Sequence, residues 1–270
     1  MRLFVALFVV AVVLPAHAAN DSMATVPAGK WTRCLHCAGK NDQVEIQLSA
    51  FRIDVDEVTQ RQYAECVQAK HCAPAKVKVK GDVALEEPVR GVSWNDADAY
   101  CKFVNKRLPT MSEWQRAAFP QVKGDDGDGP RIGTREPCKA LLIGGYDRKP
   151  CSGARVDGPA QVAIATIGAG QSTGNYDRVR VGDASSAEIF DVYGNVAEWV
   201  ADWDALPGNA EYYFKPTTRK DPKGPATGRE KLIVGGSFAA LDGSIAERMR
   251  SSRPAERPTD VGIRCAATIP

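Results

Sequence analysis

Few residues of this 270-residue chain have the types and spacing that catalysis needs. His36 and His71 both sit beside cysteines, and the third histidine, His17, lies in the apolar N-terminal leader. The sequence contains no G-x-S-x-G, no P-loop, no G-x-G-x-x-G and no H-E-x-x-H. A Ser-His-Asp or Cys-His device would have to use His36 or His71, and neither lies in a motif typical of one. The common nucleophilic, nucleotide-binding and zinc-protease devices are therefore not expected.

The cysteines are the other group with chemical potential. There are eight, at Cys34, Cys37, Cys66, Cys72, Cys101, Cys138, Cys151 and Cys265. The C-x-x-C at 34–37 could be a zinc half-site or a redox pair, but no second C-x-x-C, H-x-H or thioredoxin-like βαβ pattern accompanies it. We therefore expect structural disulfides. Local pairs 34–37, 66–72 and 138–151 would leave Cys101 and Cys265 to close a long loop, and the sequence by itself leaves this connectivity open.

Residues 1–18, MRLFVALFVVAVVLPAHA, have the features of a cleaved secretory signal. Arg2 precedes an apolar run from Leu3 to Leu14, and Ala16-His17-Ala18 matches a small-x-small cleavage site. A membrane anchor is the alternative, but the run is shorter than the ~20 residues of a spanning helix. We expect a periplasmic or secreted protein with no membrane span after cleavage. The formal net charge of +2 gives no electrostatic argument for a nucleic-acid partner.

The elements that would position a site are short. Residues 44–55 alternate apolar and polar positions, which predicts a strand. One helix should begin after the N-cap Thr59, and a second within residues 92–107 should bury Cys101 on its core side. Thr110 and Glu113 have the spacing of a capping box, which predicts a third helix start.

The second half of the chain is less regular. A long irregular insertion rich in glycine, aspartate and proline is expected at about 120–175. The stretch 231–238, KLIVGGSF, predicts a buried strand stopped by glycines, and 261–269, VGIRCAATI, predicts a final strand. Together these patterns predict an α+β fold. We expect residues 19–43 to form an N-terminal segment with the C-x-x-C, followed by one domain over residues 44–270.

Four segments then carry a resemblance to a known family. They are EVTQRQYAECV, PVRGVSWNDADAYCKFVNKRLPTMSEWQRAA, DVYGNVAEWVADW and VGGSF…RMRSSRP…DVGIRCA. In this order, over roughly residues 44–267, they are similar to the sulfatase-modifying factor, or formylglycine-generating enzyme, domain. The resemblance implies one compact domain with little regular secondary structure and a fold related to C-type lectins. It also implies a long-range disulfide between Cys101 and Cys265.

The resemblance implies, in addition, that the best-known chemistry of the family is missing. Its enzymes oxidise a sulfatase cysteine to formylglycine with two copper(I)-binding cysteines, the first shortly after the G-G-S-aromatic turn and the second five residues later. Those positions fall at Ala240 and Ile245, and neither side chain can ligate copper or act as a thiolate. Copper is therefore not expected as a cofactor, and the catalytic residues of any other reaction are unknown.

The family's calcium sites are better matched. In YGNVAEW, Asn195 and Glu198 correspond to oxygen ligands and Val196 to a backbone carbonyl, which are donors that calcium prefers. A structural calcium ion is expected there. The alternative is that Asn195 caps a turn while Glu198 lies in solvent. Gly174-Asn175 could belong to the family's other calcium site.

Three residues could line a cleft beside Gly236: Ser237, Trp199 and Arg250. Trp199 and Trp203 lie four residues apart and could flank a ligand groove, although such a pair is more often core packing. The C-terminal arginines invite an anion-binding interpretation. The acidic residues among them, including Glu256 and Asp260, favour structural ion pairs instead, and Arg264 is expected to be structural.

Two functions follow from the resemblance. The first is an exported maturation or tailoring protein of divergent chemistry, as for a relative that matures a siderophore chromophore without the cysteine pair. The second is a non-catalytic module that binds a small molecule or a protein in a periplasmic signalling or secretion system. Fold alone does not choose between them.

Overall fold

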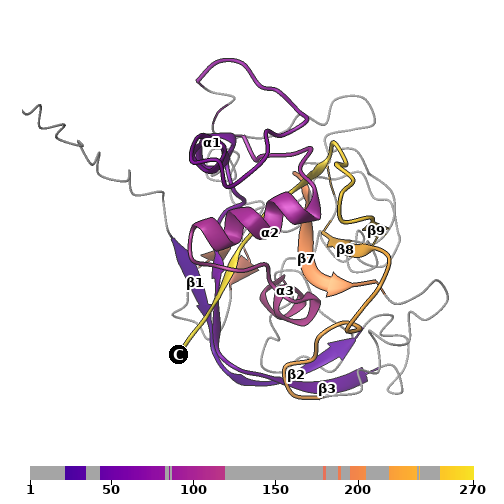
Figure 1. Ribbon diagram of the computed structural model, residues 1–270. Coiled ribbons are helices and arrows are strands. Elements are labelled where there is room, and N and C mark those ends of the chain that lie inside the picture. Colours follow the sequence, from indigo (N-terminus) through magenta and orange to yellow (C-terminus); the bar gives the residue numbers. More distant parts are fainter. Residues whose placement is uncertain are drawn as a thin grey trace, which may run out of the picture.

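The structure of the protein is a computed structural model that describes residues 22–34, 43–82, 85, 87–118, 179–180, 188–189, 195–204, 219–235, 237 and 250–270. Its helices are α1 (Gln60–Gln68), α2 (Trp94–Phe103) and α3 (Met111–Ala118). They lie among several small sheets. The strand pair of β2 (Gly29–Cys34) and β3 (Gln43–Leu48) extends at the opposite end of the domain from α1 (Figure 1). The predicted α+β class is confirmed. No helix among these residues is long and apolar enough to span a bilayer.

The first two helices begin where local sequence predicts. At α1, the Thr59 hydroxyl accepts from the backbone N–H of Gln62 at 3.1 Å, and the Gln62 side chain accepts from the Thr59 N–H at 2.8 Å. At α2, Ser93 and Asp96 make the same reciprocal pair, each bond 3.1 Å long. Each box satisfies two backbone donors that a helix start leaves unpaired. The predicted helix after Thr59 and the burial of Cys101 on α2 are confirmed.

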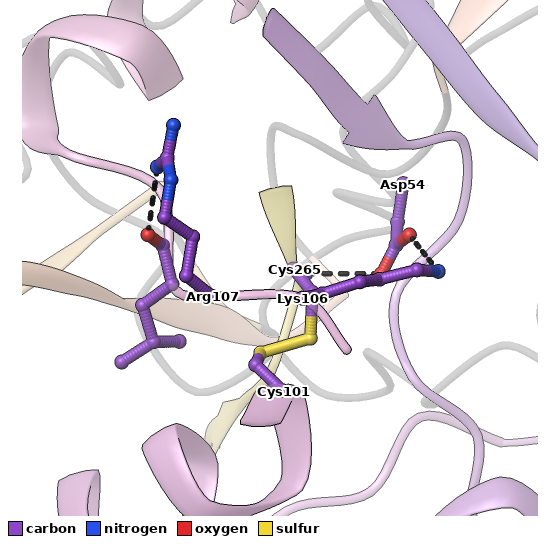
Figure 2. The surroundings of a disulfide bond; sticks show 6 residues. Asp54, Cys101, Lys106, Arg107 and Cys265 are labelled. Atoms are coloured by element: carbon purple, nitrogen blue, oxygen red, sulfur yellow. Dashed lines mark hydrogen bonds and ion pairs between the residues drawn. A yellow bond between two sulfur atoms is a disulfide. The ribbon is translucent and has the colours of Figure 1, made fainter. Parts of the chain in front are cut away.

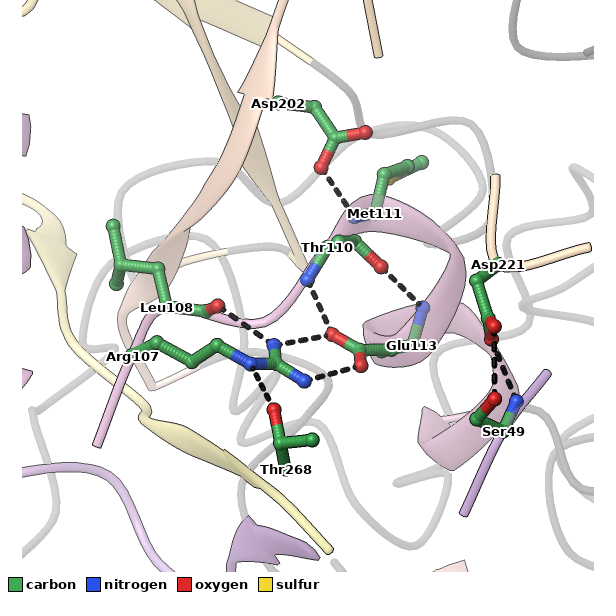
Figure 3. Close-up of polar contacts among 9 residues, drawn as sticks. All are labelled: Ser49, Arg107, Leu108, Thr110, Met111, Glu113, Asp202, Asp221 and Thr268. Carbon is green, nitrogen blue, oxygen red and sulfur yellow. Dashed lines mark hydrogen bonds and ion pairs between the residues drawn. The ribbon is translucent and has the colours of Figure 1, made fainter. Parts of the chain in front are cut away.

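The third helix start is tied to its surroundings as well as capped. Thr110 and Glu113 form the predicted capping box (Figure 3), with bonds of 3.1 and 2.8 Å. Arg107 grips both oxygens of Glu113, at 2.6 and 2.7 Å. The Asp202 carboxylate accepts from the Met111 N–H at 2.7 Å, which places a negative charge at the positive end of the helix dipole. α3 is thereby fixed against the strand β7 (Ala197–Trp203), which contains Asp202.

The strands form four small sheets. In sequence order they are β1 (Met23–Val26), β2 (Gly29–Cys34), β3 (Gln43–Leu48), β4 (Phe51–Asp54), β5 (Val179–Arg180), β6 (Glu188–Ile189), β7 (Ala197–Trp203), β8 (Lys231–Val234), β9 (Arg250–Ser252), β10 (Val261–Gly262) and β11 (Ala266–Thr268). The sheet orders are β1-β4-β11, β10-β7-β8-β9, β2-β3 and β5-β6. All pairs are antiparallel except β10 with β7. The predicted buried strand at 231–238 is confirmed as β8, with every residue buried.

Two strand predictions need correction. The single strand over 44–55 is two strands, because Ser49 turns away to donate its N–H and hydroxyl to Asp221 at 2.6 and 2.8 Å. The final strand over 261–269 is also two, β10 and β11, in different sheets. Before residue 43, β1 pairs with β4 and β2 pairs with β3, so these described residues share sheets with later strands of the chain.

Two disulfides staple the interior. Cys101 on α2 is bonded to Cys265, 164 residues later, and Cys66 is bonded to Cys72. Beside the first, Asp54 accepts from the Lys106 ammonium at 2.7 Å and from the Cys265 N–H at 3.0 Å (Figure 2). Burial raises the pKa of Asp54, and Lys106 acts against that rise. Both pairings are confirmed.

The remaining predictions on the middle of the chain fall where no structure is described. The irregular insertion at about 120–175, the pair 138–151 and the second calcium segment Gly174-Asn175 all lie outside the described residues. So does Cys37 of the pair 34–37.

Candidate functional site

Of the three residues predicted to line a cleft, two are brought together at the end of the four-stranded sheet. Ser237 follows β8 and Arg250 opens β9. The buried Ser237 hydroxyl donates to the Asp260 carboxylate at 2.6 Å, and the Arg250 guanidinium donates to the same oxygen at 2.7 Å. The Arg250 side chain is 44% exposed, whereas that of Asp260 is 11% exposed. An aspartate inside the site therefore fixes a guanidinium that still reaches solvent.

This arrangement suits binding and orientation better than nucleophilic attack. The Ser237 hydroxyl donates its proton to a carboxylate that also accepts from the Arg250 guanidinium. A serine nucleophile is normally activated by an imidazole. His71, the single histidine among the described residues, stacks on Phe103 at 5.2 Å between ring centroids. The exposed edge of Arg250 can take an anionic group through charge-assisted hydrogen bonds.

Trp199, the third predicted cleft residue, is core. Its ring is fully buried, and its indole N–H donates to the Val92 carbonyl at 3.1 Å. Trp199 is therefore packed in the core, and its side chain does not lie on a surface with Ser237 and Arg250.

The residues expected to bind calcium form a different structure. Glu198 is 1% exposed and pairs with the fully buried Arg264 at 2.8 Å. Its first carboxylate oxygen also accepts from the Arg264 Nε at 2.9 Å, and its second accepts from the Trp114 indole at 2.6 Å. Burial opposes the charge on Arg264, but the attraction of Glu198 more than compensates and raises the pKa of Arg264 above its ordinary value. Both oxygens of Glu198 and its charge are therefore committed to protein partners.

Asn195 and Val196 serve a neighbouring carboxylate. The Asn195 side chain donates to Glu57 at 2.7 Å and the Val196 N–H donates to Glu57 at 3.2 Å. Asn195 has a φ of 50°, the left-handed conformation that asparagine tolerates in turns. The described residues include no group of three or more His, Cys, Asp or Glu side chains placed to hold a metal. Asn195, Val196 and Glu198 as arranged here do not fit a calcium ion, because Arg264 already supplies the positive charge.

Ala240 and Ile245, which are predicted to stand at the family's copper-ligand positions, lie outside the described residues, as does Gly236. Among the cysteines whose side chains are described, none is free.

One buried cation was missed by the sequence interpretation. Lys231, 4% exposed at the start of β8, lies over the rings of Trp94 and Trp203 at 4.0 and 3.8 Å from their centroids. Its ammonium donates to the Ala201 carbonyl at 2.7 Å. Cation–π attraction to two indoles and this hydrogen bond stabilise the buried ammonium. No local signal indicates the cluster, because its members come from α2, β7 and β8.

Lys231 should make stability depend on pH. Burial lowers its pKa from 10.5 to about 8, although Asp202 and Asp98 act to raise it. Between these values the folded protein has released this proton and the unfolded chain still holds it, so the free energy of unfolding should rise with pH. We expect the wild type to gain stability relative to Lys231→Met across this window, on the order of 1–3 kcal/mol. Urea unfolding of both proteins on either side of the window measures the difference, and a constant difference would contradict the assignment.

Fold and site together define a protein of the formylglycine-generating enzyme type. The family model for the sulfatase-modifying factor enzyme 1-like domain matches residues 10–269, and the chain belongs to this family. The formylglycine-generating enzyme of Thermomonospora curvata is 33% identical over 188 residues, which are 67% of this chain and 55% of the relative. A Bos taurus protein named inactive C-alpha-formylglycine-generating enzyme 2 is 60% identical over 40 residues, 15% of this chain and 13% of the relative.

The fold is also found among solved structures. PvdO from Pseudomonas aeruginosa has a TM-score of 0.60 and 18% identity, over 93% of this chain and 96% of PvdO. The chain spans about half the length of the first two curated relatives, 55% and 52%. The resemblance drawn from the four sequence segments is confirmed, and the relation to C-type lectins stays a prediction.

Proposed function

We propose that this chain is an exported maturation or tailoring protein that keeps the formylglycine-generating enzyme fold but does not use a copper thiolate pair. The observation that carries the proposal is that the two positions predicted for the family's copper cysteines hold Ala240 and Ile245, which have no sulfur. The disulfides of Cys101 and Cys66 support it further, because bonded cysteines cannot take over the missing role.

The site at the end of β8 and β9 supports a role in holding a substrate. Asp260 fixes the Arg250 guanidinium, and 44% of the Arg250 side chain remains exposed. A substrate with a carboxylate or another anionic group would find a preorganised donor there. The apolar leader of residues 1–18 and the disulfides favour an oxidising compartment outside the cytoplasm.

The test is a direct assay for formylglycine. Purified protein is supplied with copper and a sulfatase-type cysteine peptide, and the peptide is analysed by mass spectrometry. We expect the cysteine to remain unmodified, because the positions that the resemblance assigns to the copper ligands hold alanine and isoleucine. Formation of formylglycine by the wild type would overturn the proposal.

A matched gain-of-function variant sharpens the result. Ala240→Cys/Ile245→Cys restores the two sulfurs at the family positions and changes nothing else. If those positions correspond as the sequence indicates, the double variant should bind copper(I) in competition with a chelator, and the wild type should not. Equal copper binding by the two proteins would show that the positions were wrongly assigned.

A non-catalytic binding module is the second candidate. The specific observation in its favour is that the Ser237 hydroxyl is buried and donates a hydrogen bond to Asp260. The described part of the site therefore offers no activated nucleophile. The 40-residue match to a relative that is named inactive points the same way. Isolating the protein from its native compartment separates the two: a molecule that co-purifies and is recovered unchanged after incubation supports the module, and its conversion supports the enzyme.

A further inference from the structure

The loop between α1 and α2 concentrates positive charge on one side of the molecule. From Cys66 to Gly81 the chain has no carboxylate, and it carries four lysines, Lys70, Lys76, Lys78 and Lys80. All four are exposed, and the whole chain has a formal net charge of only +2. In Figure 1 this stretch loops outward next to α1, away from the strand pair of β2 and β3. Residues 66–81 thus form a positively charged surface on a protein whose positive and negative charges nearly cancel.

The loop is held firmly in place at its first half. Cys66–Cys72 closes its beginning, and the Tyr63 hydroxyl donates to the Ala73 carbonyl at 2.7 Å. The Arg257 guanidinium donates to the Pro74 carbonyl, also at 2.7 Å. These contacts link the loop both to α1 and to the C-terminal segment, so its backbone has few ways to move.

Gly91 is the second anchor. The Lys76 N–H donates to the Gly91 carbonyl at 2.9 Å, and the Gly91 N–H donates to Val261 in β10 at 3.2 Å. A Cβ at Gly91 would lie 2.8 Å from the Val77 side chain, so the loop packs directly on this glycine. Residues 78–80 therefore follow a segment whose position is fixed by its contacts with Gly91.

Residues 76–80, K-V-K-V-K, alternate in exposure. Lys76, Lys78 and Lys80 are exposed, whereas Val77 and Val79 are half-buried. The backbone bends at Lys76 and Val77 and has neither a bend nor a turn at residues 78–80. A period of two fits an extended chain there, and it places the ammonium groups of Lys78 and Lys80 on one side at a spacing of roughly 6–7 Å. Gly81, with a φ of 90°, ends the stretch.

The backbone of this stretch is also open. Among the described residues, no hydrogen bond reaches the N–H or carbonyl groups of residues 77–80. Unpaired groups on an extended segment are a template for another strand, and flanking lysines repel neutral or basic chains while they attract acidic ones. A bilayer would use the charges but could not use the open backbone.

We propose that residues 77–80 are a docking edge for an extended acidic segment of a partner protein, which adds as a strand and places carboxylates beside Lys78, Lys80 and the flanking Lys76. The recognition combines main-chain hydrogen bonds with alternating charge pairs. This surface is independent of the site at Ser237 and Arg250, and it does not rest on the function proposed there.

The test uses a synthetic peptide of about ten residues with glutamate at alternate positions, labelled for fluorescence anisotropy. We expect saturable binding to the full protein that weakens as salt rises, because exposed charges are screened. Lys76→Glu/Lys78→Glu/Lys80→Glu should weaken binding by about tenfold or more. Since all three side chains are exposed, the variant should keep the circular dichroism spectrum of the wild type.

The control variant is Lys220→Glu/Lys223→Glu/Arg229→Glu, which makes the same change in net charge at exposed positions elsewhere. It should bind the peptide like the wild type, and an equal loss would mean that only net charge matters. A peptide of the same charge with prolines between its glutamates cannot pair along the edge. It should bind at least several-fold more weakly, and equal binding would overturn the strand-pairing geometry.

Two further measurements keep the proposal falsifiable. Hydrogen exchange of the amides of residues 77–80 should slow when the glutamate peptide is bound, and unchanged exchange would contradict docking at this edge. Vesicles of phosphatidylglycerol test the membrane as the occupant. Binding to vesicles without binding to the peptide would overturn the proposal.

Discussion

Replacing Arg264 by methionine is expected to destabilise the protein by about 3–5 kcal/mol, because it leaves the Glu198 carboxylate charged and buried without its partner. Arg264 is fully buried, and it also donates to the carbonyls of Asp54 and Val55 at 3.0 and 2.9 Å. The loss should appear in urea unfolding as a lower midpoint at an unchanged slope.

Two controls define what that result means. Arg250→Met breaks an ion pair whose guanidinium is 44% exposed, and it should cost no more than about 1 kcal/mol. Arg264→Met/Glu198→Gln removes both charges and should be less destabilised than the sum of the two single variants. Additivity of the two losses would show that the pair does not interact as described. Insensitivity of both single variants to added calcium would agree with Glu198 being committed to Arg264 rather than to a metal.

Removing the disulfide between Cys101 and Cys265 is expected to cost about 5 kcal/mol by the chain-entropy model, since the loop that it closes spans 164 residues. The variant Cys101→Ala/Cys265→Ala should therefore unfold at a much lower urea concentration than the wild type. Because both cysteines are buried against α2 and β11, the loss of packing adds to the entropic effect.

The local disulfide is the matched comparison. Cys66→Ala/Cys72→Ala opens a loop with a sequence separation of only 6, for which the same model gives about 2 kcal/mol. The order of the two losses is the critical result. A larger loss from opening the local disulfide would show that loop entropy does not govern the stabilisation.

The parts of the fold that sequence predicted are those decided by neighbouring residues. The helix starts at Thr59 and Thr110 need only a partner three residues away, and both are present. The strand predicted over 44–55 failed because its break is decided by Asp221, 172 residues from Ser49. Alternation of residue types cannot reveal such a contact.

The same distinction explains the site. The motif YGNVAEW predicts a set of oxygen ligands. In the structure, Arg264, which lies 66 residues further along the chain, donates to the Glu198 carboxylate instead. Ser237, Asp260 and Arg250 come from three separate segments of the chain. The sequence could indicate these residues as candidates, but it could not predict that Ser237 and Arg250 donate to the same carboxylate. The Lys231 cluster has no local signature for the same reason.

The long-range disulfide also sets an order of events during biosynthesis. Cys101 lies on a helix made early, whereas Cys265 is the last cysteine of the sequence, next to β11, which fills one side of the β1-β4-β11 sheet. A growing chain must therefore hold a reactive Cys101 thiol, close to the already complete pair Cys66 and Cys72, until its final stretch is available. Throughout that interval the first sheet lacks its third strand as well. Folding of this protein thus depends on residues that follow Cys101 by 164 or more positions. If Cys101 pairs wrongly before they are made, the thiolate of Cys265 or of another thiol must attack the wrong disulfide to release it.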